Sequence, residues 1–402
     1  MTTSAKVVPD LVLSEAVERL RELCAISSPS GDAAGIRAVA SVLGSRLTVH
    51  GFSVEIAEEP DANGVLQPVL FARSRPSGAP HLLLLGHTDT VLPAIEPTSR
   101  DRMLFGTGAL DMKGGLAMLL GALDLLAARG EQVPPDTLVV LVPDEESESV
   151  ISGAAANRWS RGARAVVVLE PGQATAEGET LVAGRRGLTE WKLLVRGRAA
   201  HSGVSYWSGR SAVAAAADWC ARAQGLSRPG TAPTVNVGRL VGGGSDFVAN
   251  LATEHSMLGS SRQINVVSDR AVAEGEIRYL TARDGAQMLE ELQRLAHEIA
   301  TRHETEVVFT PGVSIPPVDP NGPGAPLIQR AVDLAAKRGL ALQVEEDRGG
   351  VSFSNFIADP ATTPVIDGLG PTGEGMHVRG EYLSLESLER RIALLADLLP
   401  TL

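Results

Sequence analysis

The side chains best placed to do chemistry are acids and histidines that follow apolar segments of strand length. Four groups occur: His87-Thr88-Asp89 after HLLLLG, Pro143-Asp144-Glu145-Glu146 after TLVVLV, Glu170-Pro171-Gly172 after AVVVL, and His377 beyond TPVIDGLG. A fifth candidate, Asp111, directly precedes a helical pattern, where free backbone amides favour a carboxylate. Since ligands bind at the carboxyl ends of strands in open α/β sheets, these residues are expected to meet at one edge of a sheet.

This set of donors is typical of a zinc centre. Imidazole and carboxylate ligands without thiolates suit zinc, with cobalt or manganese as substitutes. Neutral His87 and His377 with ionised Asp111, Glu146 and Glu170 supply three negative charges. Two divalent ions and a bridging hydroxide would balance that charge, so the sequence favours two metal ions per chain.

Two further acids are expected to act on this centre without binding the metal. Glu145 stands beside a ligand and is the natural general base. Asp89 lies two residues from His87 and can hold that imidazole in one tautomer. A lone His-x-Asp pair or acidic run is more often a surface feature, so the prediction depends on their joint placement. The remaining histidines are expected to be structural or exposed: His50, His81, His255, His297 and His303.

The elements that must position these residues form an α/β core. Strands that are apolar on both faces alternate with helical segments, which is the pattern of a sheet covered by helices on both sides. The expected strands are 81–86, 137–142, 163–170, 341–345 and 363–370, and the expected helices are 11–24, 33–46, 115–130, 325–338 and 384–400. We therefore predict an α/β catalytic domain with a mixed, mainly parallel sheet.

A different pattern occupies the middle of the chain. Alternating strands at 188–197, 234–243, 270–280 and 306–310 are separated by helices at 211–225 and 286–303. This β-α-β-β-α-β order is that of a ferredoxin-like module on an antiparallel sheet. The chain is thus expected to hold one discontinuous catalytic domain, residues 1–184 and 312–402, with a ferredoxin-like α+β domain inserted at 185–311.

Length and composition narrow the class of protein. The 402 residues suffice for two or three domains of roughly 150 residues each, and 44% hydrophobic against 21% charged residues is a globular composition. A net charge of −12 argues against nucleic-acid binding. No apolar run is long enough to cross a membrane, and MTTSAKVVPD lacks a signal-peptide core. With only Cys24 and Cys220, far apart, we expect a soluble cytoplasmic enzyme that binds neither nucleic acid nor membranes.

The candidate residues, in this order, resemble the acetylornithine deacetylase, succinyl-diaminopimelate desuccinylase and glutamate carboxypeptidase family of zinc metallopeptidases, peptidase family M20. The resemblance implies that His87, Asp111 and Glu170 bind one zinc ion. It implies that Asp111, Glu146 and His377 bind the second, with Asp111 as the bridge. The matching segments are GHTDTV (86–91), GTGALDMKGG (106–115), PDEES (143–147), LEPG (169–172), RAAHSG (198–203) and GMHVRGEY (375–382).

The resemblance also assigns roles outside the metal ligands. Glu145 matches the family's general base and Asp89 its His-orienting acid. The inserted domain would be the lid and dimerisation domain, and His201 matches a histidine that reaches the partner subunit's active site and stabilises the oxyanion. Asn265 and Arg278 match positions that bind the substrate's carboxylate, a task for which the planar guanidinium of arginine is suited.

Three departures from the family pattern bear on substrate choice. Residues 245–264 stand where the family usually has only a few residues, near the expected substrate-binding surface. Phe353, in RGGVSFSN, replaces a common aspartate, whose loss could change recognition of a substrate amine or the support of the loop. Ser268 replaces a usual proline. Because none of these is a metal ligand, we expect altered substrate choice with intact hydrolytic chemistry.

The leading hypothesis is a metal-dependent amidohydrolase that uses a two-zinc-bound water to cleave an amide bond next to a carboxylate. It would be a glutamate-carboxypeptidase-like peptidase or an N-acyl-amino-acid deacylase, and a homodimer acting on a small molecule, an N-acyl amino acid or a short peptide. Glu145 would take the proton of the water and deliver it to the leaving nitrogen, while His201 supports the oxyanion. Two alternatives stay open: an acyl- or aminoacyl-transferring enzyme on the same scaffold, and a non-catalytic binding homologue.

Overall fold

The computed structural model describes residues 8–78, 81–147, 149–250 and 265–402. Contacts within the chain divide it into two compact units. Unit 1 comprises residues 1–185 and 320–402, and unit 2 comprises residues 186–319. Most of the long segment 245–264, namely residues 251–264 with His255, lies outside the described residues.

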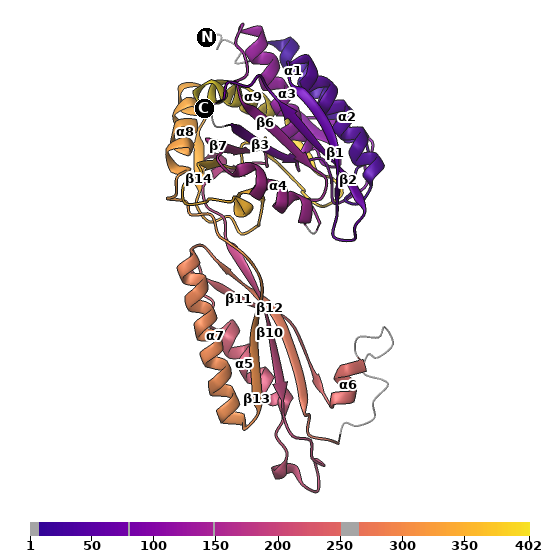
Figure 1. Ribbon diagram of the computed structural model, residues 1–402, viewed down its shortest axis with the longest axis vertical. Coiled ribbons are helices and arrows are strands. Elements are labelled where there is room, and N and C mark those ends of the chain that lie inside the picture. Colours follow the sequence, from indigo (N-terminus) through magenta and orange to yellow (C-terminus); the bar gives the residue numbers. More distant parts are fainter. Residues whose placement is uncertain (1–7, 79–80, 148, 251–264) are drawn as a thin grey trace. The chain divides into compact units, whose positions relative to one another are not determined.

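A six-stranded sheet forms the centre of unit 1, in the order β1-β2-β6-β3-β7-β15 (Figure 1). The strands β6, β3, β7 and β15 are parallel, and β1 and β2 add an antiparallel hairpin at one edge. Both β3 and β6 are buried along their whole length, as strands covered on both faces must be. The bounds are β1 (Ser53–Pro60), β2 (Leu66–Arg73), β3 (Leu82–His87), β6 (Thr137–Val142), β7 (Ala165–Val168) and β15 (Val365–Ile366).

Helices cover this sheet, which confirms the expected fold class. α3 is apolar on almost every side because it lies between the sheet and the helices α1 and α9. α2 packs on β1 and β2, and α4 packs on β3 and β6. The bounds are α1 (Asp10–Ala25), α2 (Ala33–Val49), α3 (Lys113–Ala128), α4 (Val150–Ser160), α8 (Ala325–Lys337) and α9 (Leu385–Leu398).

Two small sheets complete unit 1, in the orders β14-β9-β8 and β16-β17-β5-β4. The second of these carries the loop of His377, which lies between β16 and β17. The bounds are β4 (Thr98–Arg100), β5 (Met103–Phe105), β8 (Ala174–Thr175), β9 (Gly178–Val182), β14 (Leu342–Glu345), β16 (Gly373–Glu374) and β17 (Tyr382–Ser384), with 3-10 turns η2 (Phe353–Phe356) and η3 (Leu399–Thr401).

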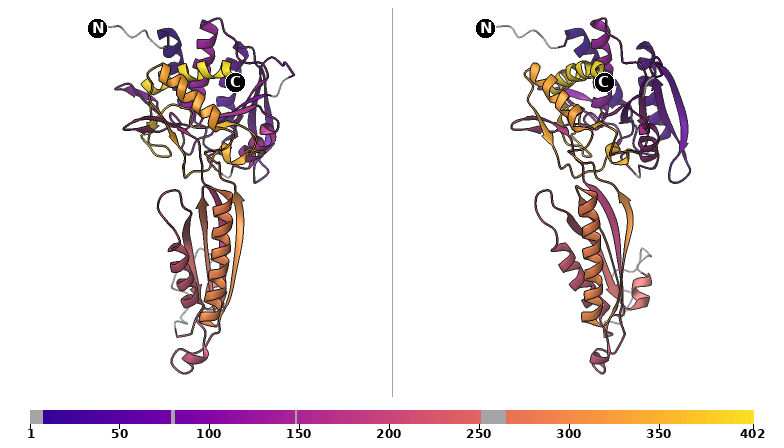
Figure 2. Two further views of the ribbon diagram at one scale, coloured as in Figure 1. Left: turned by 90° about the vertical axis from the view of Figure 1, so that its left-hand side faces the viewer. Right: turned by 60° about the vertical axis from the view of Figure 1, so that its left-hand side comes forward.

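Unit 2 has the expected β-α-β-β-α-β order on an antiparallel sheet, arranged β11-β12-β10-β13. Two helices, α5 and α7, cover one face of this sheet (Figure 2). Trp191, Trp219 and Phe309 pack there, with ring centroids 5.0 to 6.4 Å apart. The bounds are β10 (Gly187–Arg196), η1 (Tyr206–Ser208), α5 (Ala212–Gln224), β11 (Thr234–Gly243), α6 (Ser245–Asn250), β12 (Arg270–Tyr279), α7 (Ala282–His303) and β13 (Glu306–Ile315).

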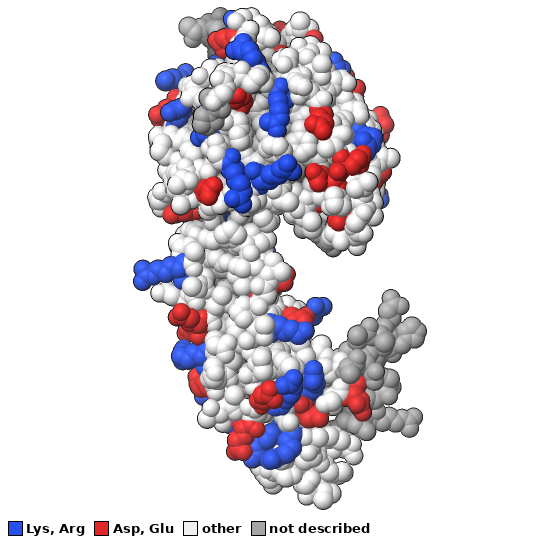
Figure 3. All heavy atoms as spheres, viewed as in Figure 1, with Lys and Arg blue, Asp and Glu red and all other residues white. Residues whose placement is uncertain are grey.

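The other face of that sheet is polar. Acidic and basic side chains are interspersed on the visible face of unit 2 (Figure 3), and Lys192 pairs with Glu274 at 3.3 Å between Nζ and Oε1. This alternation of apolar and charged residues along the strands is what the sequence predicts for a sheet with one solvated face.

The sequence missed several features of the fold. The hairpin β1–β2 and helix α4 were not expected, and β13 continues past residue 310 to Ile315. Pro311 and Gly312 suggest a strand end, but β13 is an edge strand, where a missing backbone N–H is tolerated. Among the described residues, no helix is long and apolar enough to cross a membrane.

Trp219 provides a test of the unit 2 core because its side chain is completely buried. We expect Trp219→Ala to lower the free energy of unfolding by about 3–5 kcal/mol, through lost burial and the cavity left behind. Trp207, which is 88% exposed, supplies the matched control, and Trp207→Ala should change stability by less than about 0.5 kcal/mol. Urea denaturation followed by circular dichroism measures both. Equal losses in the two variants would contradict this account of the core.

Candidate metal centre

The parallel strands β6, β3 and β7 bring the expected site residues to one edge of the sheet. His87 is the last residue of β3 and pairs in register with Val142, the last residue of β6. Leu85 pairs with Val168, the last residue of β7. The acids that follow β6 and β7 therefore emerge beside His87, as the sequence predicts.

Asp111 reaches the same place from the start of α3. The helix begins two residues later at Lys113, and it approaches the sheet closely because of Gly115. A Cβ added at Gly115 would lie 2.2 Å from the carbonyl oxygen of Leu169, so only glycine fits there. The close approach sets Asp111 beside Glu170, which directly follows Leu169.

The carboxylate of Asp111 faces a histidine with each of its two oxygens. Oδ1 lies 3.3 Å from Nε2 of His87, and Oδ2 lies 3.3 Å from Nε2 of His377. Glu170 Oε1 is 3.7 Å from the same nitrogen of His87, and Glu146 Oε2 is 3.0 Å from that of His377. The geometry therefore has two halves that share Asp111, each with one histidine and one glutamate of its own.

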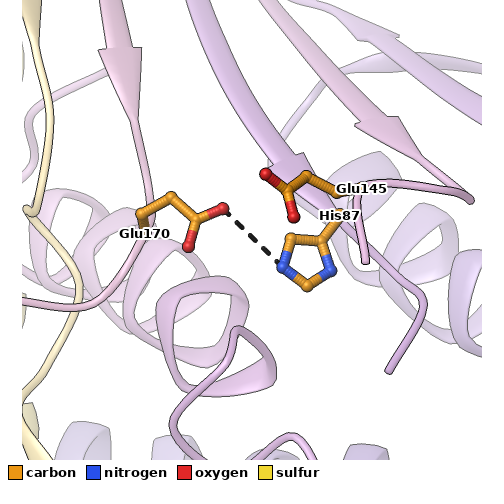
Figure 4. Close-up of side chains that lie close together, drawn as sticks. All are labelled: His87, Glu145 and Glu170. Atoms are coloured by element: carbon orange, nitrogen blue, oxygen red, sulfur yellow. Dashed lines mark ion pairs between the residues drawn. The ribbon is translucent and has the colours of Figure 1, made fainter. Parts of the chain in front are cut away.

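Glu145 points toward the His87 half. Figure 4 shows the side chains of His87, Glu145 and Glu170 converging at the end of β3. Their candidate ligand atoms all lie within 4.8 Å of one another, as do those of His87, Asp111 and Glu146. Glu145 is thus close to any group that His87 and Glu170 bind together.

The carboxylate of Asp89 makes contacts beyond the imidazole of His87, which we expect it to orient. Its Oδ1 lies 3.3 Å from Nδ1 of His87. Its two carboxylate oxygens also accept the backbone N–H groups of Glu145 and Glu146 at 3.3 and 3.2 Å, and Oδ2 accepts the hydroxyl of Ser30 at 2.7 Å. This buried acid therefore ties the end of β3 to the loop after β6.

Burial, and after it the crowding of like charges, shifts the protonation of the acids. Burial raises the pKa of Glu145 to about 7 and that of Glu146 to about 8, with the charge of Asp111 adding to both. Burial, followed by the same charge, raises the pKa of Glu170 well above its usual value. Burial alone would also raise the pKa of Asp111, but hydrogen bonds with His377 and His87 hold it well below its usual value.

The histidines respond in the opposite sense. The hydrogen bond with Asp111 raises the pKa of His377 to about 9, and the charge of Glu146 adds to it. Burial lowers the pKa of His87, but hydrogen bonds with Asp111 and Asp89 outweigh burial and raise it well above the usual value. With these raised pKa values, protons on the histidines offset part of the negative charge of the clustered carboxylates.

A divalent cation fits this cluster better than protons do. Oε1 of Glu170 is buried and has no hydrogen-bond partner among the described residues, which is costly for a carboxylate oxygen. Imidazole nitrogens and carboxylate oxygens that converge without thiolates are ligands suited to zinc, cobalt or manganese. The residues present therefore fit a metal ion in each half.

Glu381 is a further residue of the site. In the sequence it stands inside the segment GMHVRGEY (375–382), where no role was expected of it. Its buried carboxylate accepts the backbone N–H groups of Gly108, Leu110 and Asp111 at 2.8, 2.8 and 2.9 Å. The loop that follows His377 is thereby fastened to the loop that carries Asp111. No local pattern could reveal this, because some 270 residues separate the partners.

Phe353 takes no polar part in the site. Its side chain is 1% exposed, and its ring centroid is 6.5 Å from that of His87. The loop around it is supported by its neighbours: Ser354 donates a 2.7 Å hydrogen bond to Asp367, which also accepts one of 2.7 Å from Arg185. The missing aspartate is therefore not needed to hold this loop.

The three expected substrate-contacting residues belong to unit 2. His201 is exposed, and its Nδ1 accepts the backbone N–H groups of Gly203 and Val204 at 3.1 Å each. Asn265 is its neighbour, because the carbonyl of Asn265 accepts the N–H of Ser202 at 2.9 Å. Arg278 lies near the far end of β12 and forms a two-pronged ion pair with Glu276 at 3.0 Å.

Replacing the carboxylate of Glu381, which accepts the backbone hydrogen bonds of the Asp111 loop, tests its contribution to metal binding. In Glu381→Gln an amide NH2 would face backbone donors, so we expect metal affinity to fall roughly 10- to 100-fold. Competition against a chelating indicator measures the dissociation constant, and circular dichroism reports folding. Glu386→Gln, at an exposed acid near the start of α9, is the control. An unchanged metal affinity in correctly folded Glu381→Gln would show that Glu381 does not support the metal ligand Asp111.

Cation binding must displace protons from this centre. At neutral pH the raised pKa values of Glu146 and His377, about 8 and about 9, keep protons on groups that bind metal only without them. Metal affinity should therefore rise with pH up to about 9, with proton release on binding. Calorimetry in buffers of different ionisation enthalpy counts the protons. His377→Gln should release fewer, and a pH-independent affinity would contradict the cited shifts.

Comparisons with known proteins identify relatives that match nearly the whole chain. A model of peptidase family M20/M25/M40 matches residues 83–401. Carboxypeptidase G2 of Pseudomonas sp. (strain RS-16) is 27% identical over 390 residues, covering 95% of this chain and 88% of its own length. Succinyl-diaminopimelate desuccinylase of Stenotrophomonas maltophilia is 29% identical over 401 residues, covering 94% and 96%.

Solved structures share the fold across nearly the whole chain. Aminopeptidase PepT of Bacillus cereus has a TM-score of 0.76 at 21% identity, covering 98% of each chain. The M20 family metallo-carboxypeptidase Sso-CP2 of Sulfolobus solfataricus has a TM-score of 0.68 at 18% identity, covering 96% of this chain and all of the other. The family match spans most of the chain and includes the acids and histidines of the metal centre, so this protein belongs to peptidase family M20/M25/M40, metal-dependent hydrolases of amide and peptide bonds.

Proposed function

We propose that the chain cleaves an amide bond next to a carboxylate, as a carboxypeptidase of dipeptides or acyl-glutamates or as a deacylase of N-acyl amino acids. The observation that carries the proposal is the carboxylate of Asp111, whose two oxygens each face a separate His–Glu pair. That arrangement supports two metal ions per chain, with zinc as the proposed metal and cobalt or manganese as substitutes. Bound there, the ions would polarise the amide carbonyl and acidify a water molecule.

Glu145 is the proposed general base. Burial raises its pKa to about 7, so at neutral pH it can both accept and return a proton. It takes a proton from the attacking water and delivers it to the leaving nitrogen. Asp89 holds the backbone of Glu145 and so positions the base without touching the substrate.

His201 is the proposed support of the oxyanion. Because Nδ1 accepts two backbone N–H groups, the neutral ring carries its proton on Nε2. That N–H is a donor on an exposed side chain, which suits the stabilisation of a developing negative charge.

The positions of Asn265 and Arg278 support a homodimer. Residues 270–278 of β12 alone span about 26 Å, and Asn265 precedes them, so one chain cannot direct both side chains at one carboxylate. We assign them to the sites of two copies: Arg278 acts with one copy, and Asn265 with its neighbour His201 acts with the other. The cytoplasm remains the proposed location, because Cys24 and Cys220 are both free thiols.

Glu145→Gln tests the base directly. The amide cannot accept the proton of water, so we expect kcat to fall by roughly 10²- to 10⁴-fold while metal content is retained. Metal analysis and hydrolysis of a panel of N-acyl amino acids and dipeptides measure the two effects. Glu146→Gln is the comparison and should lose metal as well. Near-normal turnover in Glu145→Gln would remove the base assignment.

Mixing two inactive variants tests whether His201 serves the other copy. Glu145→Gln and His201→Ala chains, refolded or exchanged together, form hybrid dimers with one intact site, made of Glu145 from one chain and His201 from the other. Random pairing should restore about a quarter of wild-type activity, because half the dimers are hybrids with one working site. A mixture as inactive as its components would place His201 in the site of its own chain.

A further inference from the structure

We infer that a groove between α4 and the hairpin β1–β2 binds a small apolar carboxylate, at a second site apart from the metal centre. The groove holds a cavity of about 260 Å³ that lies wholly within unit 1 and is lined by none of the candidate metal ligands. Its volume is below the roughly 300–1,000 Å³ of sites for drug-sized ligands, so the ligand is a small molecule. Most of the lining is apolar: Val69, Phe71, Val150, Ile151, Ala155 and Trp159.

The groove exists because α4 covers only part of the sheet. α4 packs on β3 and β6, whereas α2 packs on β1 and β2. Side chains alternate along a strand, and Leu70 points toward α2, where a Cβ added at Gly44 would lie 3.4 Å from it. Val69 and Phe71 therefore face the opposite side and line the groove. Val150, on the α4 wall, is 45% exposed, so an apolar ligand would remove apolar surface from water.

Two guanidinium groups lie at one end of the groove. The Cζ atoms of Arg73 and Arg158 are each 4.8 Å from the ring centroid of Trp159, and Arg158 itself lines the cavity. Neither guanidinium forms an ion pair with an acid in the part of the chain that the structure describes. A guanidinium group offers two parallel N–H donors to a carboxylate. The two groups therefore favour a ligand that supplies the carboxylate.

The acidic part of the lining is separate from these guanidinium groups. Glu59 lines the cavity and pairs in register with Gln67, which is four residues, or about 13 Å, along β2 from Phe71. Phe71 contacts Trp159, with ring centroids 5.5 Å apart. Glu55 pairs with Phe71 in the sheet but does not line the cavity. The carboxylate of the ligand is thus expected at the Trp159 end, and its apolar body along the rest of the groove.

The first experiment varies the charge on one ligand frame. Hydrocinnamate, its neutral amide and phenylpropylammonium are titrated into nitrogen-15-labelled, zinc-loaded protein. The indole N–H signal of Trp159, identified by its loss in Trp159→Phe, reports binding by NMR. We expect a saturable shift with hydrocinnamate, roughly tenfold weaker binding of the amide, and the weakest binding with the ammonium ion.

Two results of this titration would overturn the inference. The first is a preference for hydrocinnamate over the amide or the ammonium ion of less than about threefold, because the guanidinium groups would then not select the charge. The second is the lack of a saturable shift of the Trp159 signal below roughly 10 mM hydrocinnamate.

Replacing the guanidinium groups connects the selectivity to named side chains. Arg158→Gln, alone and together with Arg73→Gln, should weaken hydrocinnamate binding roughly tenfold or more and leave binding of the amide unchanged. Arg161→Gln is the matched control, since Arg161 is the C-cap of α4 and donates instead to Oδ1 of Asn157 at 2.8 Å. Unchanged hydrocinnamate affinity in the double variant would overturn the assigned contact.

Filling the groove tests its position without removing a charge. Ala154 lines the cavity and is exposed on α4, so Ala154→Phe can add a ring there while the helix stays folded. We expect this variant to lose hydrocinnamate binding, with an unchanged circular dichroism spectrum. Ala336→Phe, at an exposed alanine of α8, is the control and should bind as the wild type does. Binding that persists in Ala154→Phe would place the carboxylate elsewhere and overturn the inference.

Discussion

Mutual repulsion among carboxylates is the constraint that shapes unit 1. Asp89, Asp111, Glu145, Glu146 and Glu170 lie close together around one fully buried histidine. Such a cluster is unfavourable unless cations, backbone N–H groups or protons offset the charge. The fold provides the fixed part of that compensation. Asp89 receives backbone N–H groups from the loop after β6, and the amides around Asp111 are fastened by Glu381. The protons on His377 and Glu146 supply the part that a metal ion can replace.

Much of this centre could be predicted from the sequence, because its geometry follows from strand order. His87 ends an apolar strand, and Glu146 and Glu170 come after two neighbouring apolar strands. Parallel neighbours bring such residues together whatever the conformation of the loops. Glu381 and the group of Arg185, Ser354 and Asp367 could not be predicted, since their partners lie far along the chain and no local pattern marks them. The hairpin β1–β2 was missed because its strands carry prolines and weak alternation, and β13 because Pro311 resembles a strand end.

In unit 2, the sequence motifs and the folded structure give different information about the expected substrate-contacting residues. The motifs group His201, Asn265 and Arg278 as residues that act on one substrate. In the structure, Asn265 precedes the long strand β12, whereas Arg278 lies near the far end of that strand. The length of β12, which the alternating pattern predicts well, is the reason why we assign Asn265 and Arg278 to the sites of different copies in the proposed dimer. The exposed rings of Tyr206 and Trp207, by contrast, gave no signal in the sequence, because exposure is a property of the folded loop.

The two halves of the centre differ in their access to solvent. His87 is completely buried, whereas the side chain of His377 is 53% exposed. In the proposed two-metal centre, an ion in the His377 half would therefore exchange with the surrounding solution more readily than one in the His87 half. Loss and uptake of metal would then proceed in two phases with different rates, and the metal content of a purified sample would depend on its history.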